Sequence, residues 1–122
     1  MEIKQLKQTF SVCQVEDYSL TRLDAEFCFT GKTDGERSLV CATADVPPNT
    51  VRRDDGWRGF RIQGVLDFSL VGILSRLATV LADNGIAIFA LSTYNTDYIL
   101  VKQAQLDQAV DALRRAGYDL TE

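Results

Sequence analysis

The sequence predicts an α+β protein made of two ferredoxin-like lobes, the first of which has degenerate helices. In the C-terminal half, strand-like and helix-like segments follow one another in the order β-α-β-β-α-β, which is the ferredoxin-like order. In the N-terminal half, similar strands recur, but only short segments stand where the helices would fall. A chain of 122 residues has room for one compact unit, or for two very small units that share a core.

The C-terminal half begins with a strand and a helix. Residues 57–64 alternate between the two sides of a strand. Apolar residues then recur at helical spacing from Leu70 to Leu81, with Ser69 as the expected N-cap. Gly85 suits the left-handed position that ends a helix.

A hairpin, a second helix and a last strand complete this half. Residues 86–91 are apolar at every position, which is typical of a central strand or of one covered on both faces. Turn-forming residues 93–96 separate them from a second strand at 97–102, so we expect an antiparallel hairpin. Residues 106–116 carry an apolar helical stripe, and residues 118–120 suit a short final strand.

The N-terminal half has the same strands in a weaker pattern. We predict strands over residues 8–15, 27–30 and 38–42, the last two joined by a turn rich in Gly and Asp. The segments 16–24 and 43–49 are short for helices, and Pro47-Pro48 prevents a long helix in the second.

The best boundary between the halves is the polar stretch at residues 49–56. We therefore expect a degenerate N-terminal lobe over residues 1–56 and a complete C-terminal domain over residues 57–122.

The composition excludes several kinds of function. The chain has no histidine, which rules out Ser-His-Asp and Cys-His catalysis and removes the commonest zinc ligand. With a net charge of −4 and no basic cluster, nucleic acid is not an expected partner. No apolar run reaches the length of a membrane span, and the N-terminus lacks a signal-peptide core, so we expect a cytoplasmic protein without membrane contact. We expect no metal and no cofactor.

The three cysteines do not form a C-x-x-C pair. Cys13, Cys28 and Cys41 each lie in an apolar or strand-like segment. We expect them to be reduced and mostly buried, as small hydrophobic residues of a cytosolic protein.

Two parts of the chain resemble a known family. The segment GVLDFSLVGILSRLATVLADNGIAIFALSTYNTDYILV (64–101) resembles an ACT domain, the small ligand-binding module of amino-acid-controlled proteins. Together with GERSLVC, DVPPN and GWRGFRIQG, it is similar to the bacterial tandem-ACT proteins related to the cytosolic arginine sensors of animals. The resemblance implies two ACT lobes that bind an amino acid.

The resemblance also implies a ligand site made of two segments. In ACT domains a D-x-P-G motif joins the first strand to the first helix, and Asp67 and Gly72 take the places of its Asp and Gly, although no proline is present and FSLV lies between them. The ligand contacts carried over from the family are Gly72 and Ile73 in this loop and Thr93, Tyr94 and Asp97 in the hairpin. The complete candidate set is Asp67, Phe68, Ser69, Gly72, Ile73, Thr93, Tyr94, Asn95, Thr96 and Asp97.

The chemistry of these residues suits an amino-acid zwitterion. Free backbone N–H groups at the start of the helix suit a ligand carboxylate, and the Asp97 carboxylate suits an ammonium or guanidinium group. Alternatively, Asp97 and Asn95 are ordinary turn residues that bond to nearby backbone. Tyr94 either covers a ligand or caps the edge of the sheet. The hypothesis requires the two segments to be adjacent, within one domain or across a domain interface.

We therefore expect a non-catalytic amino-acid sensor that works through pairing of domains or subunits, in a homodimer. The alternative is an interaction or dimerisation module with an empty pocket. A small enzyme that uses Asp67 or Asp97 as a base is the least favoured hypothesis.

Overall fold

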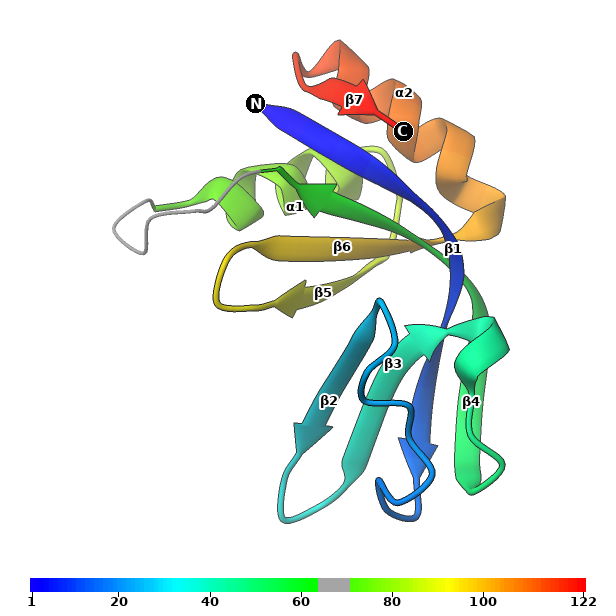
Figure 1. Ribbon diagram of the computed structural model, residues 1–122. Coiled ribbons are helices and arrows are strands. Elements are labelled where there is room, and N and C mark those ends of the chain that lie inside the picture. Colours follow the sequence, from blue (N-terminus) through cyan, green and yellow to red (C-terminus); the bar gives the residue numbers. More distant parts are fainter. Residues whose placement is uncertain (64–70) are drawn as a thin grey trace. The chain divides into compact units, whose positions relative to one another are not determined.

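A computed structural model describes residues 1–63 and 71–122, which form seven strands and two α-helices arranged in two compact units (Figure 1). The first unit comprises Met1–Lys7 and Arg58–Glu122, and the second comprises Gln8–Trp57. Strands β1 (Glu2–Val15) and β4 (Thr50–Ile62) each contribute residues to both units. The predicted division into residues 1–56 and 57–122 stays a prediction.

The first unit has the predicted mixed α/β order. After β4 come α1 (Ile73–Asp83), β5 (Ile88–Ser92), β6 (Asp97–Lys102), the short 3-10 helix η2 (Gln103–Gln105), α2 (Leu106–Arg115) and β7 (Asp119–Thr121). The strand order is β1-β4-β6-β5, and β7 pairs with β1 in parallel. The N-terminal residues of the chain therefore lie within the sheet of the C-terminal half, which the sequence pattern did not predict.

The β5–β6 hairpin is antiparallel, as predicted, and Ser92 lies opposite Asp97 in its last pair. The expectation that residues 86–91 form a central strand, or one covered on both faces, is wrong. Among the described strands β5 lies at one end of the order, and Ala90 and Ser92 are exposed. Uninterrupted apolar character did not distinguish a buried strand from an apolar edge strand.

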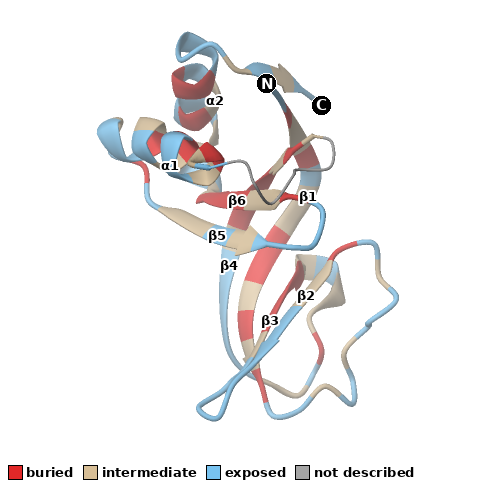
Figure 2. Cartoon of the chain, turned by 90° about the vertical axis from the view of Figure 1, so that its left-hand side faces the viewer, coloured by how far each residue is buried: buried red, intermediate tan, exposed pale blue. Residues whose placement is uncertain are grey.

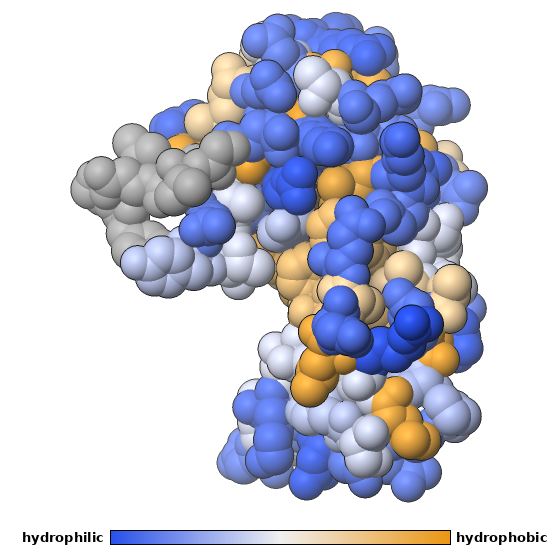
Figure 3. Space-filling model, viewed as in Figure 1, coloured by the Kyte–Doolittle hydropathy of each residue, from blue (hydrophilic) through white to orange (hydrophobic). Residues whose placement is uncertain are grey.

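Both helices pack on one face of this sheet. The core consists of Ile3, Phe60, Ile62, Ile73, Leu77, Leu81, Ile86, Ile99, Val101, Ala109 and Leu113. Since these residues include alternate positions of β4 and β6, the other positions of those strands point to the opposite face. Buried positions run along α1, α2 and β6 (Figure 2), while hydrophilic residues gather over the outer side of α2 (Figure 3).

Helix α1 begins later than the sequence pattern indicated. Its N-cap is Gly72, with a φ of 81°, and the Arg76 N–H donates to the Gly72 carbonyl at 2.9 Å. The predicted N-cap Ser69 is therefore wrong, and Gly72 lies before the helix rather than one turn inside it. A left-handed residue cannot continue a right-handed helix, and glycine adopts this conformation without a steric penalty.

The same helix, whose last residue is Asp83, is terminated by the glycine that the sequence predicted. Gly85 has a φ of 72°, its N–H donates to Ala82 at 3.0 Å, and the Ile86 N–H reaches back to Leu81 at 3.0 Å. These two bonds are those of a Schellman motif, which satisfies carbonyls that the helix end leaves open.

The second unit is built from strands with little helix. Strand β3 (Arg37–Ala42) pairs with β1 on one side and with β2 (Cys28–Lys32) on the other, all antiparallel. The segment 43–49, which was expected to be too short for a long helix, contains only the 3-10 helix η1 (Thr43–Asp45), just before the two prolines. Most of the predicted boundary segment 49–56 belongs to β4.

The cysteines lie together on the strands of the second unit. Cys13 and Cys41 are buried in a small apolar cluster with Val15 and Leu39, and half-buried Cys28 lies opposite Cys41. All three are free thiols, as expected. The pKa of Cys41 is raised from 9.0 to about 12, mainly by burial of its thiol. Burial also raises the pKa of Cys13 and of Cys28.

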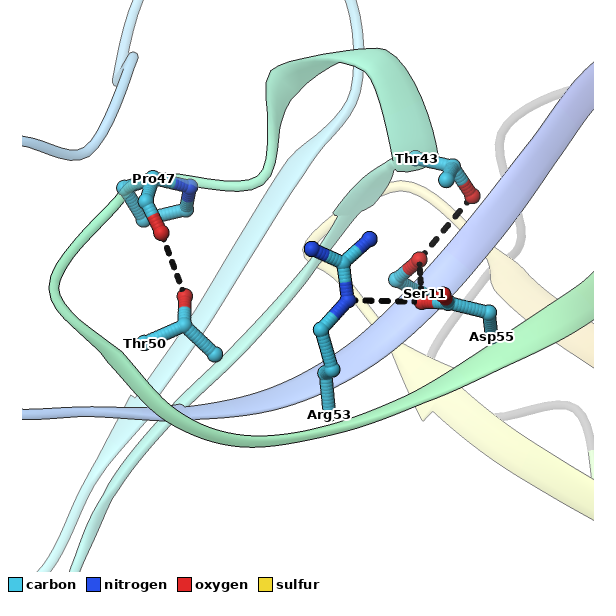
Figure 4. A network of polar contacts seen from close by, with 6 residues as sticks. All are labelled: Ser11, Thr43, Pro47, Thr50, Arg53 and Asp55. Carbon is cyan, nitrogen blue, oxygen red and sulfur yellow. Dashed lines mark hydrogen bonds and ion pairs between the residues drawn. The ribbon is translucent and has the colours of Figure 1, made fainter.

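A network of polar side chains also lies in the second unit (Figure 4). The buried Ser11 hydroxyl donates to the Asp55 carboxylate at 2.5 Å and lies 2.9 Å from the Thr43 hydroxyl. Arg53 Nε donates to the same carboxylate oxygen at 3.1 Å. These contacts join β1 to β4 within the second unit, so we regard the network as structural.

Candidate functional site

The polar residues between β5 and β6 first of all build their own turn. The Thr93 N–H donates to the Thr96 carbonyl at 2.9 Å, and the Thr93 hydroxyl donates to the same carbonyl at 3.1 Å. The Thr96 N–H approaches the Thr93 hydroxyl at 3.4 Å. Local turn chemistry therefore accounts for threonine at position 93, whereas Thr96 takes part in these bonds only through its backbone.

One side chain of the turn reaches another strand. The Thr96 hydroxyl, which is buried, donates to the Ile62 carbonyl at 2.7 Å, and Ile62 is the last residue of β4. This bond holds the turn against the end of β4 within the first unit, and both lie on the left in Figure 1. Gln63, the residue after β4, therefore lies close to the hairpin turn.

A cavity of about 320 Å³ lies at this junction. Its walls are formed by Arg61, Ile62, Gln63, Thr93, Asn95, Thr96 and Tyr98. Arg61 Nε donates to Gln63 Oε1 at 3.0 Å, which fixes the orientation of the guanidinium group. Among the described lining residues Arg61 alone carries a charge at neutral pH, so the cavity favours an anionic group such as a carboxylate.

The predicted hairpin residues do not all lie in this cavity. Thr93, Asn95 and Thr96 line it, whereas Tyr94 points outward and is 80% exposed. The half-buried Asp97 carboxylate accepts a hydrogen bond from the Ser92 hydroxyl across the hairpin at 2.7 Å.

Asp97 lies on the face of β6 that carries the helices. It is two residues before Ile99, which belongs to the core beneath α1 and α2, while Tyr98 in the cavity wall points to the opposite face. The role of Asp97 in ligand binding stays a prediction.

The other predicted segment is described only in part. Asp67, Phe68 and Ser69 lie outside the described residues. Gly72 is the N-cap of α1, and the Ile73 side chain belongs to the core, so Ile73 could contact a ligand only through its backbone.

Sequence reasoning missed four wall residues, namely Arg61, Ile62, Gln63 and Tyr98. The alternation of residues 57–64 already placed Arg61 and Gln63 together on the side of a strand opposite the apolar Phe60 and Ile62. The Arg61 cation and the Gln63 amide, on one face at the end of a strand, could therefore have indicated a polar binding site.

Two kinds of feature are absent from the described part of the chain. Within residues 1–63 and 71–122, no group of three or more Cys, Asp or Glu side chains is arranged to hold a metal ion. Neither helix in those ranges is long and apolar enough to span a bilayer.

Comparison with known proteins identifies relatives of this fold. Residues 52–115 match the ACT domain family. The structure of a protein from Agobacterium tumefaciens is 30% identical with a TM-score of 0.85, and the match covers 98% of this chain and 90% of that one. A protein of unknown function from Vibrio cholerae, described as a possible transport protein, is 20% identical with a TM-score of 0.77, over 92% and 86% of the chains.

The regulatory subunit of aspartate kinase from Thermus thermophilus shares the fold at 9% identity, with a TM-score of 0.66 over 96% of this chain and 97% of that one. No curated protein is significantly similar in sequence.

Proposed function

The chain belongs to the ACT domain family, and on that basis we propose that it is a cytoplasmic regulatory protein that binds an amino acid and does not catalyse a reaction. The observation that carries the proposal is the cavity beside the β5–β6 turn, which combines the Arg61 guanidinium with amide and hydroxyl groups. Similarity in fold to a regulatory subunit of aspartate kinase supports a regulatory role.

Within this proposal, Arg61 binds the ligand carboxylate. Its planar guanidinium can donate two parallel hydrogen bonds to a carboxylate, and the Gln63 and Asn95 amides lie in the same wall. A volume of about 320 Å³ is at the lower end of the range of small-molecule pockets, which suits a ligand of amino-acid size.

Asp97 could bind the ammonium group while keeping its bond to Ser92, because a carboxylate can accept several hydrogen bonds. Its carboxylate lies on the helix-bearing face, so such a ligand would occupy the site that the sequence predicts with Gly72, Ile73 and residues 67–69. The cavity and the predicted site share the β5–β6 turn but place the ligand on different faces of the sheet, and this difference allows them to be separated experimentally.

The output of binding, in our proposal, is pairing of ACT lobes or of subunits in a homodimer. The N-terminal lobe is then a degenerate ACT lobe, and the resemblance to tandem-ACT proteins related to arginine sensors supports this. A ligand shifts such pairing only to the extent that it binds the paired state more tightly than the unpaired one.

A thermal-shift screen against the twenty amino acids tests the function. A ligand at one hundred times its Kd stabilises the folded protein by about 2.7 kcal/mol, which is easily measured as a rise in Tm. If no amino acid at millimolar concentration raises Tm, the sensor hypothesis is wrong and the dimerisation module is favoured.

Two matched variants locate the site. Arg61→Gln should abolish the shift if the cavity holds the ligand, and Asp97→Asn should leave it unchanged. The reverse result would place the ligand on the helix-bearing face. Both side chains are at least partly exposed, so neither substitution should unfold the protein.

A further inference from the structure

A second cavity, of about 190 Å³, lies in the first unit and shares no wall residue with the first. It is lined by Gln5, Leu6 and Lys7 of β1, by Arg58 of β4, and by Glu122. β1 and β4 are neighbours in the sheet, so two cationic side chains from adjacent strands meet in one hollow. The proposed amino-acid site does not use any of these residues.

Arg58 is held in place but is not satisfied. Its Nη2 donates to the Leu6 carbonyl at 3.2 Å, which fixes the guanidinium against β1. Its Nε is buried and has no hydrogen-bond partner. An unpaired buried donor is costly, so the chain itself satisfies this guanidinium only in part.

Lys7 adds a second positive charge in the same cavity. Two like charges on neighbouring strands repel each other. Among the described residues, neither Arg58 nor Lys7 forms an ion pair with Glu122. An anion placed between them would replace repulsion by two attractions. The Gln5 amide supplies a further N–H donor in the wall.

We propose that this cavity binds a small tetrahedral oxyanion, namely phosphate or the phosphate group of a small metabolite, between Arg58 and Lys7. At ~30 Å³ for each water molecule, the cavity has the volume of about six waters, which is enough for one phosphate group. Glu122 lies in the same wall, and its negative charge should lower the affinity of the cavity for an anion.

Inorganic phosphate is the probe. Isothermal titration calorimetry and thermal shift on the full chain should both detect saturable phosphate binding, with potassium chloride at matched ionic strength giving no shift. A phosphate monoester in a parallel titration separates free phosphate from a metabolite: tighter binding of the monoester identifies a metabolite. Wild-type protein that shows no phosphate response beyond that of chloride overturns the proposal.

Variants assign the response to this cavity. Arg58→Gln and Lys7→Gln should each weaken phosphate binding by about tenfold or more, because each removes a charge-assisted contact. Glu122→Gln should tighten it. Arg52→Gln is the matched control, since Arg52 is an exposed arginine of the same strand that lines neither cavity, and it should leave phosphate binding unchanged.

Lys7 and Glu122 are exposed, so their variants keep the test valid even if Arg58→Gln does not fold. Phosphate binding that is insensitive to Lys7→Gln and Glu122→Gln overturns the proposal. The probe is phosphate, and the substituted residues do not line the first cavity. A negative result would therefore overturn the phosphate site without bearing on the proposed amino-acid site.

Discussion

Replacing Thr96 by valine tests whether one hydroxyl holds the hairpin turn against the end of β4. Threonine and valine have nearly the same shape, so Thr96→Val removes the hydroxyl while the packing volume is kept. The side chain is only 6% exposed, and its hydroxyl donates to the Ile62 carbonyl at 2.7 Å. The valine leaves that carbonyl without this donor in a place that water does not readily reach.

The expected cost follows from these two facts. An intramolecular hydrogen bond contributes about 1 kcal/mol net, and an unsatisfied buried group raises the cost of losing it to about 1–3 kcal/mol. For a chain of this size, that corresponds to a fall in Tm of roughly 3–10 °C. Because Thr96 and Ile62 both line the polar cavity, we also expect weaker ligand binding.

Urea unfolding followed by circular dichroism measures the effect. The midpoint should fall while the slope stays the same, since the surface exposed on unfolding does not change. Thr96→Ser is the control, because it keeps the hydroxyl and loses only a methyl group. If Thr96→Val is no more destabilised than Thr96→Ser, the hydroxyl does not anchor the turn and the reasoning fails.

Three further predictions concern packing, backbone and ionisation. Leu81→Ala, at a fully buried core position, should lower the free energy of unfolding by about 2–5 kcal/mol in urea titrations; a loss well below this would mean that the helices are not packed as described. Gly85→Ala should cost about 1–2 kcal/mol because φ is 72° there, whereas Gly31→Ala, which meets no atom within 4 Å, should be nearly neutral; equal Tm values for the two variants would contradict this. The pKa of Cys41, raised from 9.0 to about 12, means that the unfolded chain loses its thiol proton first, so stability should fall as the pH rises from 9 toward 12. Urea unfolding at pH 8 and pH 10 should show a smaller fall for Cys41→Ala, and an equal fall would refute the assignment.

The elements of the C-terminal half were predictable because one face of each is buried. The apolar stripe of α2 repeats with the period of a helix, and turn-forming residues separate the apolar segments of β5 and β6. Gly85 was identified because few residues other than glycine can occupy a left-handed helix end. The left-handed Gly72 was not, since the apolar periodicity before and after it looks continuous.

The first half of β1 escaped prediction for a different reason. Ile3 packs in the core under the helices, while Leu6 is buried although it points to the other face. A strand that buries residues on both faces shows no alternation of apolar and polar side chains. Residues 51–55 of β4 are exposed throughout and therefore resemble a polar linker in sequence.

The candidate site was predictable only where the turn chemistry was visible. Thr93, Asn95 and Thr96 stood out as polar residues between two apolar strands, and they line the cavity. Arg61 and Tyr98 come from strands whose pairing the sequence could not specify. Which residues meet across β4 and β6 depends on the strand order, and local patterns do not encode that order.

Strand β1 has a practical consequence for protein engineering. Its first residues pair with β7, with Glu2 opposite Asp119 and Lys4 opposite Thr121, at the far end of the sequence. A fragment that starts at residue 57 would lack this strand and expose the hydrogen-bonding groups of its sheet neighbours. Cutting the chain there should therefore yield two pieces that recover their structure only when mixed, which makes this protein suited to a split reporter rather than to dissection into independent modules.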